Sequence, residues 1–236
     1  MIKEAIILAG GLGTRLKGVI SDIPKPLAPI SGKPFLTYML EYLNTQKLER
    51  VVLSVGYKHE MIEQAFGNQY KNLLIQYSIE MEPLGTGGAI KLAMDKIVGS
   101  EVLILNGDSF IEVNLQEFNS SSKNKNAQFA IVLKEMTHFN RYGTVEFDGQ
   151  KILCFNEKKP VKKGWINSGV YFLKKDFFET LSFPEKFSFE KEFLEKYYSE
   201  YDFSGYVSNG YFIDIGIPED YDKAQEELPE IIRITA

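Results

Sequence analysis

Short apolar runs alternate with amphipathic stretches through the first half of the chain. Residues 2–9 form an apolar run that ends in glycines, as a strand buried on both faces does. Further strands are predicted at 51–55, 73–79 and 102–105. Apolar side chains at helical spacing predict helices between them, at 34–47, 58–66 and 86–98. The alternation indicates βαβ units, and therefore an α/β fold with a doubly wound, mostly parallel sheet.

The pattern changes after about residue 125. Strands are predicted at 127–133 and 169–173, and a hairpin at 144–155 that turns at Asp148-Gly149. A helix is expected over 188–201, capped by Ser188, with aromatic side chains four residues apart. Such a row of rings favours aromatic core packing or a homodimer contact over a cofactor cage.

One domain over 1–236 accounts for this order, with a half of alternating strands and helices at 1–125 and a smaller, mixed half at 126–236. We expect the polar segment Ser120–Asn124 to be a loop between the halves.

Composition excludes several classes of protein. The chain has 236 residues and a net charge of −5, which argues against nucleic-acid binding through a broad basic face. A single cysteine, Cys154, excludes a disulfide framework, and two histidines leave little room for a zinc site. The first residues do not resemble an export signal, and no run approaches the roughly 20 apolar residues of a membrane span. We therefore expect a soluble, cytoplasmic protein with no membrane partner.

Positive charge is concentrated where small phosphates could bind. Residues 8–16 follow the first strand and contain Gly10, Gly11 and Gly13, whose backbone N–H groups could face phosphate oxygens. The segment is not a P-loop, because no Lys-Ser/Thr pair closes it, and it is not a dinucleotide fingerprint, because Leu16 stands where the third glycine belongs. Arg15 can offer a bidentate fork to a polyphosphate, and two prolines hold Lys25 on a stiff segment.

Two carboxylates are candidates for a metal site. Asp108 follows the fourth strand, so it faces the crevice at the carboxyl ends of the strands, as the glycine segment does. An oxygen ligand of this kind suits Mg²⁺, which uses one or two carboxylates together with phosphates. Asp214 lies inside an apolar strand, where burial is costly without a partner or a metal.

Residues 8–16, Pro24-Lys25-Pro26-Leu27 and Gly32-Lys33-Pro34 together resemble the signature of the sugar-1-phosphate nucleotidylyltransferases. The resemblance covers residues 2 to about 224, and it implies a nucleotide-binding half at 1–125 and a sugar-binding half at 126–236. It implies that Arg15 and Lys25 act on the reacting phosphates and that Asp108 and Asp214 hold Mg²⁺. The nucleotide-binding residues that it implies are Leu8, Ala9, Gly10, Gly11, Gly13, Thr14, Glu80, Gly85 and Thr86. Either Glu80 or Glu82 could accept hydrogen bonds from a guanine.

The resemblance also implies a sugar-phosphate site. In the family, a Glu-Lys pair binds the sugar hydroxyls and the 1-phosphate, and an Asn-x-Gly segment lines the sugar pocket. The matching positions, together with the residues that precede Asp108, are Glu157, Lys158, Asn167, Gly169, Asn106 and Gly107.

The implied reaction is attack of a sugar 1-phosphate on the α-phosphorus of a nucleoside triphosphate, with loss of pyrophosphate. A phosphate monoester is already anionic, so its attack needs no general base. This agrees with the two histidines, because neither His59 nor His138 has a neighbour that suggests a catalytic triad, and both are expected at the surface. Residues 82–89 and 141–145 are most similar to the guanylyltransferases that act on D-glycero-α-D-manno-heptose 1-phosphate for surface polysaccharide. An N-acetylmuramate 1-phosphate uridylyltransferase, another hexose-1-phosphate enzyme, and a non-catalytic nucleotide-sugar-binding protein stay open as alternatives.

Overall fold

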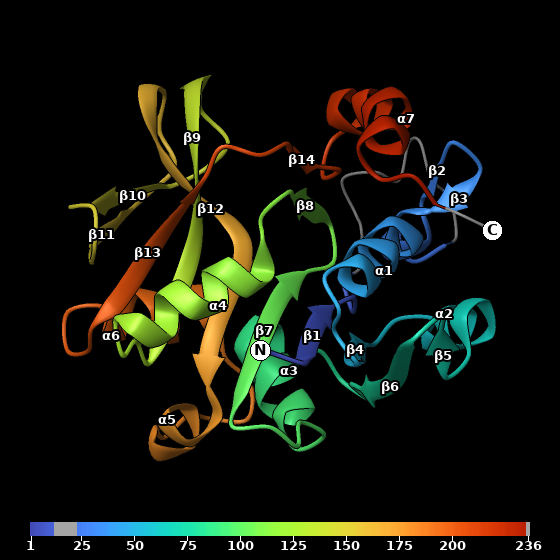
Figure 1. Ribbon diagram of the computed structural model, residues 1–236, viewed down its shortest axis with the longest axis horizontal. Helices are drawn as coiled ribbons and strands as arrows, with labels where there is room; N and C mark the ends of the chain where they lie inside the picture. Colours follow the sequence, from blue (N-terminus) through green and yellow to red (C-terminus); the bar gives the residue numbers. More distant parts are fainter. Residues whose placement is uncertain (12–22, 235–236) are drawn as a thin grey trace.

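The computed structural model describes residues 1–11 and 23–234 (Figure 1). Its central sheet has a parallel core of four adjacent strands: β7 (Glu101–Asn106), β1 (Glu4–Leu8), β4 (Arg50–Val55) and β6 (Leu73–Ile79). All four strands were expected from the apolar runs. The predicted α/β class with a mostly parallel core is confirmed.

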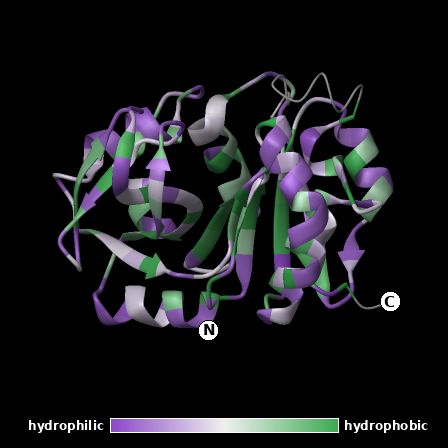
Figure 2. Ribbon diagram, turned by 90° about the horizontal axis from the view of Figure 1, so that it is seen from above, coloured by the Kyte–Doolittle hydropathy of each residue, from purple (hydrophilic) through white to green (hydrophobic). Residues whose placement is uncertain are grey.

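Alternate residues of the core strands face two separate hydrophobic clusters, because side chains on a strand point to opposite faces. Ala5 and Ile7 face one cluster, and Ile6 faces the other. The first is covered by α1 (Phe35–Thr45), α4 (Leu115–Asn124) and α7 (Pro218–Ile231). The second is covered by α3 (Gly85–Met94) and α5 (Lys175–Thr180). Seen from above, the hydrophobic strands lie between layers of helices (Figure 2).

The predicted helices form where apolar spacing placed them, including α2 (His59–Phe66). Pro34 directly precedes α1, where its fixed φ suits a helix start. No helix in the described part of the chain is both long and apolar enough to cross a membrane.

Antiparallel strands extend the sheet beyond β7. The 14-residue β12 (Val161–Lys174) pairs with β7 and β9 (Phe129–Phe139), and β13 (Phe203–Ser208) joins β9. Sequence patterning predicted only the last third of β12, because its pairing register shifts between Asn167 and Tyr171 and interrupts the apolar pattern. The predicted hairpin is present as β10 (Thr144–Phe147) and β11 (Ile152–Asn156), with Gly149 at a φ of 100°.

Short strand pairs complete the fold. β5 (Gln69–Tyr70) pairs with the outer edge of β6. β8 (Ser109–Ile111) pairs with β14 (Phe212–Asp214). β2 (Pro29–Ile30) pairs with β3 (Lys33–Pro34), just after the short 3₁₀ helix η2 (Lys25–Leu27).

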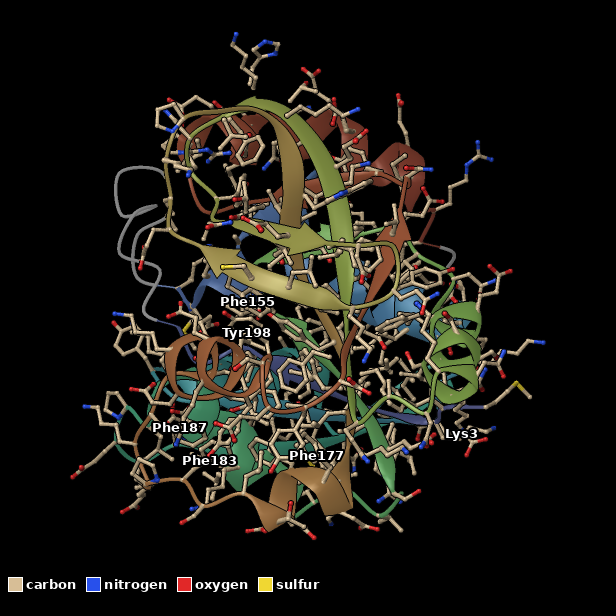
Figure 3. All side chains as sticks on the ribbon, turned by 90° about the vertical axis from the view of Figure 1, so that its left-hand side faces the viewer. Lys3, Phe155, Phe177, Phe183, Phe187 and Tyr198 are labelled. Atoms are coloured by element: carbon tan, nitrogen blue, oxygen red, sulfur yellow. The ribbon has the colours of Figure 1, made fainter. Side chains whose placement is uncertain are left out.

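The helix expected over 188–201 ends earlier than predicted, and its first part is a π-helix, which is wider than an α-helix. It consists of the π-helix η3 (Phe189–Leu194) followed by α6 (Glu195–Tyr197), and Ser188 accepts the predicted capping hydrogen bond from the amide of Lys191. Its aromatic side chains pack into the second cluster with rings from α5 and from residues 183–187 (Figure 3). Phe193 is fully buried and stacks on Phe189 at a centroid separation of 4.7 Å. The rings are core packing within one chain, and a homodimer contact stays a prediction.

The prediction of a loop at Ser120–Asn124 is wrong, because these residues form the last part of helix α4. Leu115 and Phe118 anchor this helix in the core, and Asn114 caps its first amides. The Ser120 and Ser122 hydroxyls donate to the carbonyls four residues earlier. Serines can therefore continue a helix here, because their polar groups are satisfied locally and the anchoring side chains hold the first turn.

Candidate active site

A cavity of about 730 Å³ opens at the carboxyl ends of β1, β4, β6 and β7. This is where ligands gather in α/β sheets. Eleven residues that the sequence assigned to the site line it: Leu8, Ala9, Gly10, Gly11, Lys25, Glu80, Gly85, Thr86, Asn106, Gly107 and Asp108. They come from five separate segments of the chain, so the fold assembles them.

Two glycines let neighbouring strand ends approach closely. The amide of Gly107 donates to the carbonyl of Leu8 at 3.0 Å, and a Cβ at Gly107 would lie 2.4 Å from that oxygen. A Cβ at Gly10 would lie 2.8 Å from a carboxylate oxygen of Glu80. At these two glycines, which form part of the cavity floor, bare backbone is open to a ligand.

Lys25, Asp108 and Asp214 meet beside this floor, as the resemblance implied. Lys25 Nζ donates to Asp108 Oδ2 at 2.7 Å, with only 12% of the lysine side chain exposed. Pairing of β14 with β8 brings Asp214 opposite Ser109, next to Asp108 in the chain. Burial, and then the charge of Asp108, raise the pKa of Asp214 above its ordinary value, while Lys25 opposes the shift.

The two aspartates fit a divalent cation. Each has one carboxylate oxygen in a hydrogen bond, Asp108 with Lys25 and Asp214 with the amide of Gly216 at 2.8 Å. Their mutual repulsion is the kind that a dication relieves. Within residues 1–11 and 23–234 there is no cluster of three or more potential protein ligands, so phosphate or water oxygens would have to complete the coordination shell, as is usual for Mg²⁺.

Glu80 stands at the opposite end of the cavity floor. Its carboxylate accepts hydrogen bonds from the amide of Leu84 at 3.1 Å and from the hydroxyl of Ser54 at 3.4 Å. Burial is the largest influence on Glu80 and raises its pKa, against these two hydrogen bonds. A fixed, partly desolvated acceptor of this kind suits a ligand with adjacent N–H donors.

The amino end of α3 is held by the segment that precedes η3. The amides of Gly87 and Phe187 make backbone hydrogen bonds with Phe187 and Leu84 respectively, both at 3.0 Å. Thr86 donates its hydroxyl to Glu190 at 2.7 Å and accepts from the amide of Phe189 at 2.8 Å. Glu190 thereby enters the cavity wall, although no pattern in the sequence singled it out.

Four of the six predicted sugar-phosphate residues, namely Gly169, Asn167, Glu157 and Lys158, do not line this cavity. Gly169 packs against Asn106, since a Cβ there would lie 2.7 Å from the Asn106 amide nitrogen. Asn167 donates to the buried Tyr171 hydroxyl at 2.8 Å and accepts from the amide of Gly169. Glu157 and Lys158 are exposed just after β11, and neither makes a hydrogen bond or ion pair with another described residue.

Three residues that the sequence assigned to the site are not among the described residues, and one segment that lines the cavity was not assigned. Gly13, Thr14 and Arg15 lie outside the described residues. The segment after β4, residues 56–60, lines the cavity but was given no role. It contains His59, which was expected at the surface and instead lies at the rim, 2.9 Å from Glu63. The signal for this segment was its position at the carboxyl end of a parallel strand.

The family model described as "Nucleotidyl transferase" matches residues 4–231. The chain is 52% identical over 229 residues to the D-glycero-alpha-D-manno-heptose 1-phosphate guanylyltransferase of Aneurinibacillus thermoaerophilus, covering 97% of this chain and 100% of that protein. It is 49% identical to the enzyme of the same name from Campylobacter jejuni, covering 92% and 96%. The crystal structure of HddC from Yersinia pseudotuberculosis superposes with a TM-score of 0.86 at 43% identity, covering 96% and 99%, and that protein has also been solved with GMP-PN.

These matches span the glycine segment, the lysine between prolines and both aspartates. Gly10, Gly11, Lys25 and Asp108 line the cavity, and Asp214 lies beside Asp108. From its sequence, its fold and this arrangement of residues, the chain belongs to the nucleotidyl transferase family.

Proposed function

We propose that this protein transfers a guanylyl group from GTP to D-glycero-α-D-manno-heptose 1-phosphate, producing GDP-heptose and pyrophosphate. The observation that carries the proposal is the single cavity that joins Glu80 at one end to Lys25 and Asp108 at the other. A nucleoside triphosphate has the same order of groups, with a base at one end and phosphates at the other. High identity over nearly the full length of two heptose 1-phosphate guanylyltransferases supports the choice of sugar.

Glu80 would read the base. A carboxylate accepts hydrogen bonds from the N1–H and N2 amino groups along one edge of guanine, and its two oxygens match their spacing. Adenine offers no such pair of donors on that edge. Gly10 and Gly56 leave bare backbone beside Glu80, so a flat ring can reach the carboxylate.

The phosphates would lie toward Lys25. Its ammonium group balances charge that develops on the triphosphate as pyrophosphate leaves, and Arg15 adds a second basic group by the family resemblance. Asp108 and Asp214 would hold Mg²⁺, which neutralises phosphate charge when it is bound. The Lys25–Asp108 ion pair keeps both side chains in place before the nucleotide arrives.

The sugar 1-phosphate would enter beside Asn106, where Gly169 and Asn167 lie close by. We assign Glu157 and Lys158 to the same substrate, on the exposed segment that follows β11. In this assignment, residues 1–125 bind the nucleotide and residues 126–236 bind the sugar. The anionic phosphate attacks the α-phosphorus directly, so alignment and charge neutralisation supply the catalysis.

Pyrophosphate release tests the reaction. The purified protein is incubated with Mg²⁺, each of four nucleoside triphosphates, and the 1-phosphates of heptose, mannose, glucose and N-acetylmuramate. We expect the highest kcat/KM with GTP and heptose 1-phosphate. Release with a uridine nucleotide and N-acetylmuramate 1-phosphate alone would replace the proposed substrates, and no release with any pair would identify a nucleotide-sugar-binding protein instead.

A further inference from the structure

Two exposed apolar side chains stand at the mouth of the cavity. Met81 is 89% exposed and Tyr57 is 47% exposed. Among the described residues, these are the only exposed large hydrophobic side chains that line the cavity. Exposed apolar surface at a binding site becomes favourable to bury once a ligand covers it.

The sheet brings the two segments that carry these side chains next to each other. β4 and β6 run parallel with Val55 paired to Ile79, and the amide of Glu80 donates to the carbonyl of Val55 at 2.8 Å, which extends the ladder by one residue. A Cβ at Gly56 would lie 3.8 Å from the Cβ of Glu80, so the chains stay adjacent past the strand ends. Tyr57 and Met81 each follow these positions directly.

We propose that Tyr57 and Met81 form an apolar clamp on the nucleobase whose polar edge is read by Glu80. The inference rests on the proposed function and extends it to two further residues that determine specificity. A base has a hydrogen-bonding edge and two apolar faces, and the structure supplies a group for each. Glu80 accepts hydrogen bonds from the polar edge, the glycine backbone contacts one face of the base, and Tyr57 and Met81 cover the other face.

The tyrosine ring is held at the rim before a nucleotide binds. Lys58 Nζ lies 5.3 Å from the centroid of the Tyr57 ring, a cation–π distance. Met81 has an unbranched, flexible side chain that can adapt to a ring surface. The clamp therefore combines one positioned ring with one adaptable cover.

The two parts of the base site discriminate differently. The apolar area that a clamp covers is larger for a purine than for a pyrimidine, so Tyr57 and Met81 favour GTP, ITP and ATP over UTP and CTP. They do not distinguish guanine from adenine or hypoxanthine, because ring faces differ little among purines. That distinction belongs to Glu80, since hypoxanthine lacks the N2 amino group of guanine.

Binding measurements by isothermal titration calorimetry separate these contributions. Dissociation constants for GTP, ITP, CTP and pyrophosphate are measured in Mg²⁺ for the wild type, Tyr57→Ala, Met81→Ala and Met81→Leu. Loss of stacking is expected to weaken GTP and ITP by about tenfold each. The GTP-to-ITP ratio should stay as in the wild type, pyrophosphate binding should not change, and Met81→Leu should recover most of the affinity.

Leu74→Ala is the matched control, since Leu74 is 51% exposed on β6 and does not line the cavity. It should bind GTP as the wild type does, whereas Glu80→Gln should change the GTP-to-ITP ratio. The proposal is overturned if both alanine variants bind GTP within twofold of the wild type, if pyrophosphate weakens equally, or if the wild type binds CTP as tightly as GTP. GTP binding without pyrophosphate release would refute the proposed reaction and leave these ratios as a valid test of the clamp.

Discussion

Replacing Lys25 with alanine should cost this protein far more activity than stability. Lys25 Nζ and Asp108 Oδ2 are 2.7 Å apart, a separation at which two unit charges attract by about 6 kcal/mol for an effective dielectric constant of about 20. However, 45% of the Asp108 side chain is exposed, so desolvation and solvent screening leave a net contribution to folding of about 1 kcal/mol or less.

The effect on the reaction is expected to be larger. Once a triphosphate excludes water from the cavity, the ammonium group faces charge that grows as pyrophosphate leaves, and losing one such interaction costs about 2.7–4 kcal/mol, or 10²–10³ in kcat. Since Lys25 acts mainly on this developing charge, kcat should fall more than KM for the triphosphate rises.

The assay is continuous detection of released pyrophosphate at saturating sugar phosphate, together with thermal melting. Lys33→Ala is the matched control, because Lys33 is an exposed lysine nearby in the chain and does not line the cavity. Its kcat should equal that of the wild type. If Lys25→Ala kept kcat within threefold of the wild type while folding normally, the assignment of Lys25 to the reacting phosphates would be wrong.

Three further predictions concern the packing and charge around the site. Burial and the charge of Asp108 raise the pKa of Asp214, so its ionised form destabilises the fold. Asp214→Asn should therefore raise Tm at pH 7, by a margin that shrinks as the pH falls through the carboxyl range, while Mg²⁺-dependent activity is lost; an unchanged Tm would contradict this. Gly87→Ala should destabilise by about 1–3 kcal/mol in urea, because its Cβ would lie 2.1 Å from the Phe187 ring, and Phe187→Leu should recover part of the loss. The ion pair of Arg141 with Asp220 joins the β9–β10 connection to α7, so a double-mutant cycle of Arg141→Ala and Asp220→Asn should give a coupling of about 0.5–1 kcal/mol. Additive effects would show that this contact is incidental.

Local signals in the sequence were sufficient for the parallel core. Each core strand is a short apolar run buried on both faces, and each helix between them has one apolar side, so period and length distinguish the two kinds of element. The same signals were misleading where side chains satisfy their own polar groups. Ser120–Asn124 resembles a loop in composition, yet it continues a helix because the serine hydroxyls bond to backbone carbonyls one turn earlier.

The sequence by itself singled out the glycine segment and Asp108 by their position after strands, and Lys25 by the prolines that flank it, while it left Glu80 and Glu82 as alternatives. Only the tertiary structure decided which residues meet. Asp214 reaches Asp108 through the pairing of β14 with β8, across about a hundred residues of chain. Glu190 enters the cavity wall because η3 packs against the amino end of α3, and no local pattern carries that information. Local sequence encodes the elements, whereas long-range pairing and packing decide which side chains share a site.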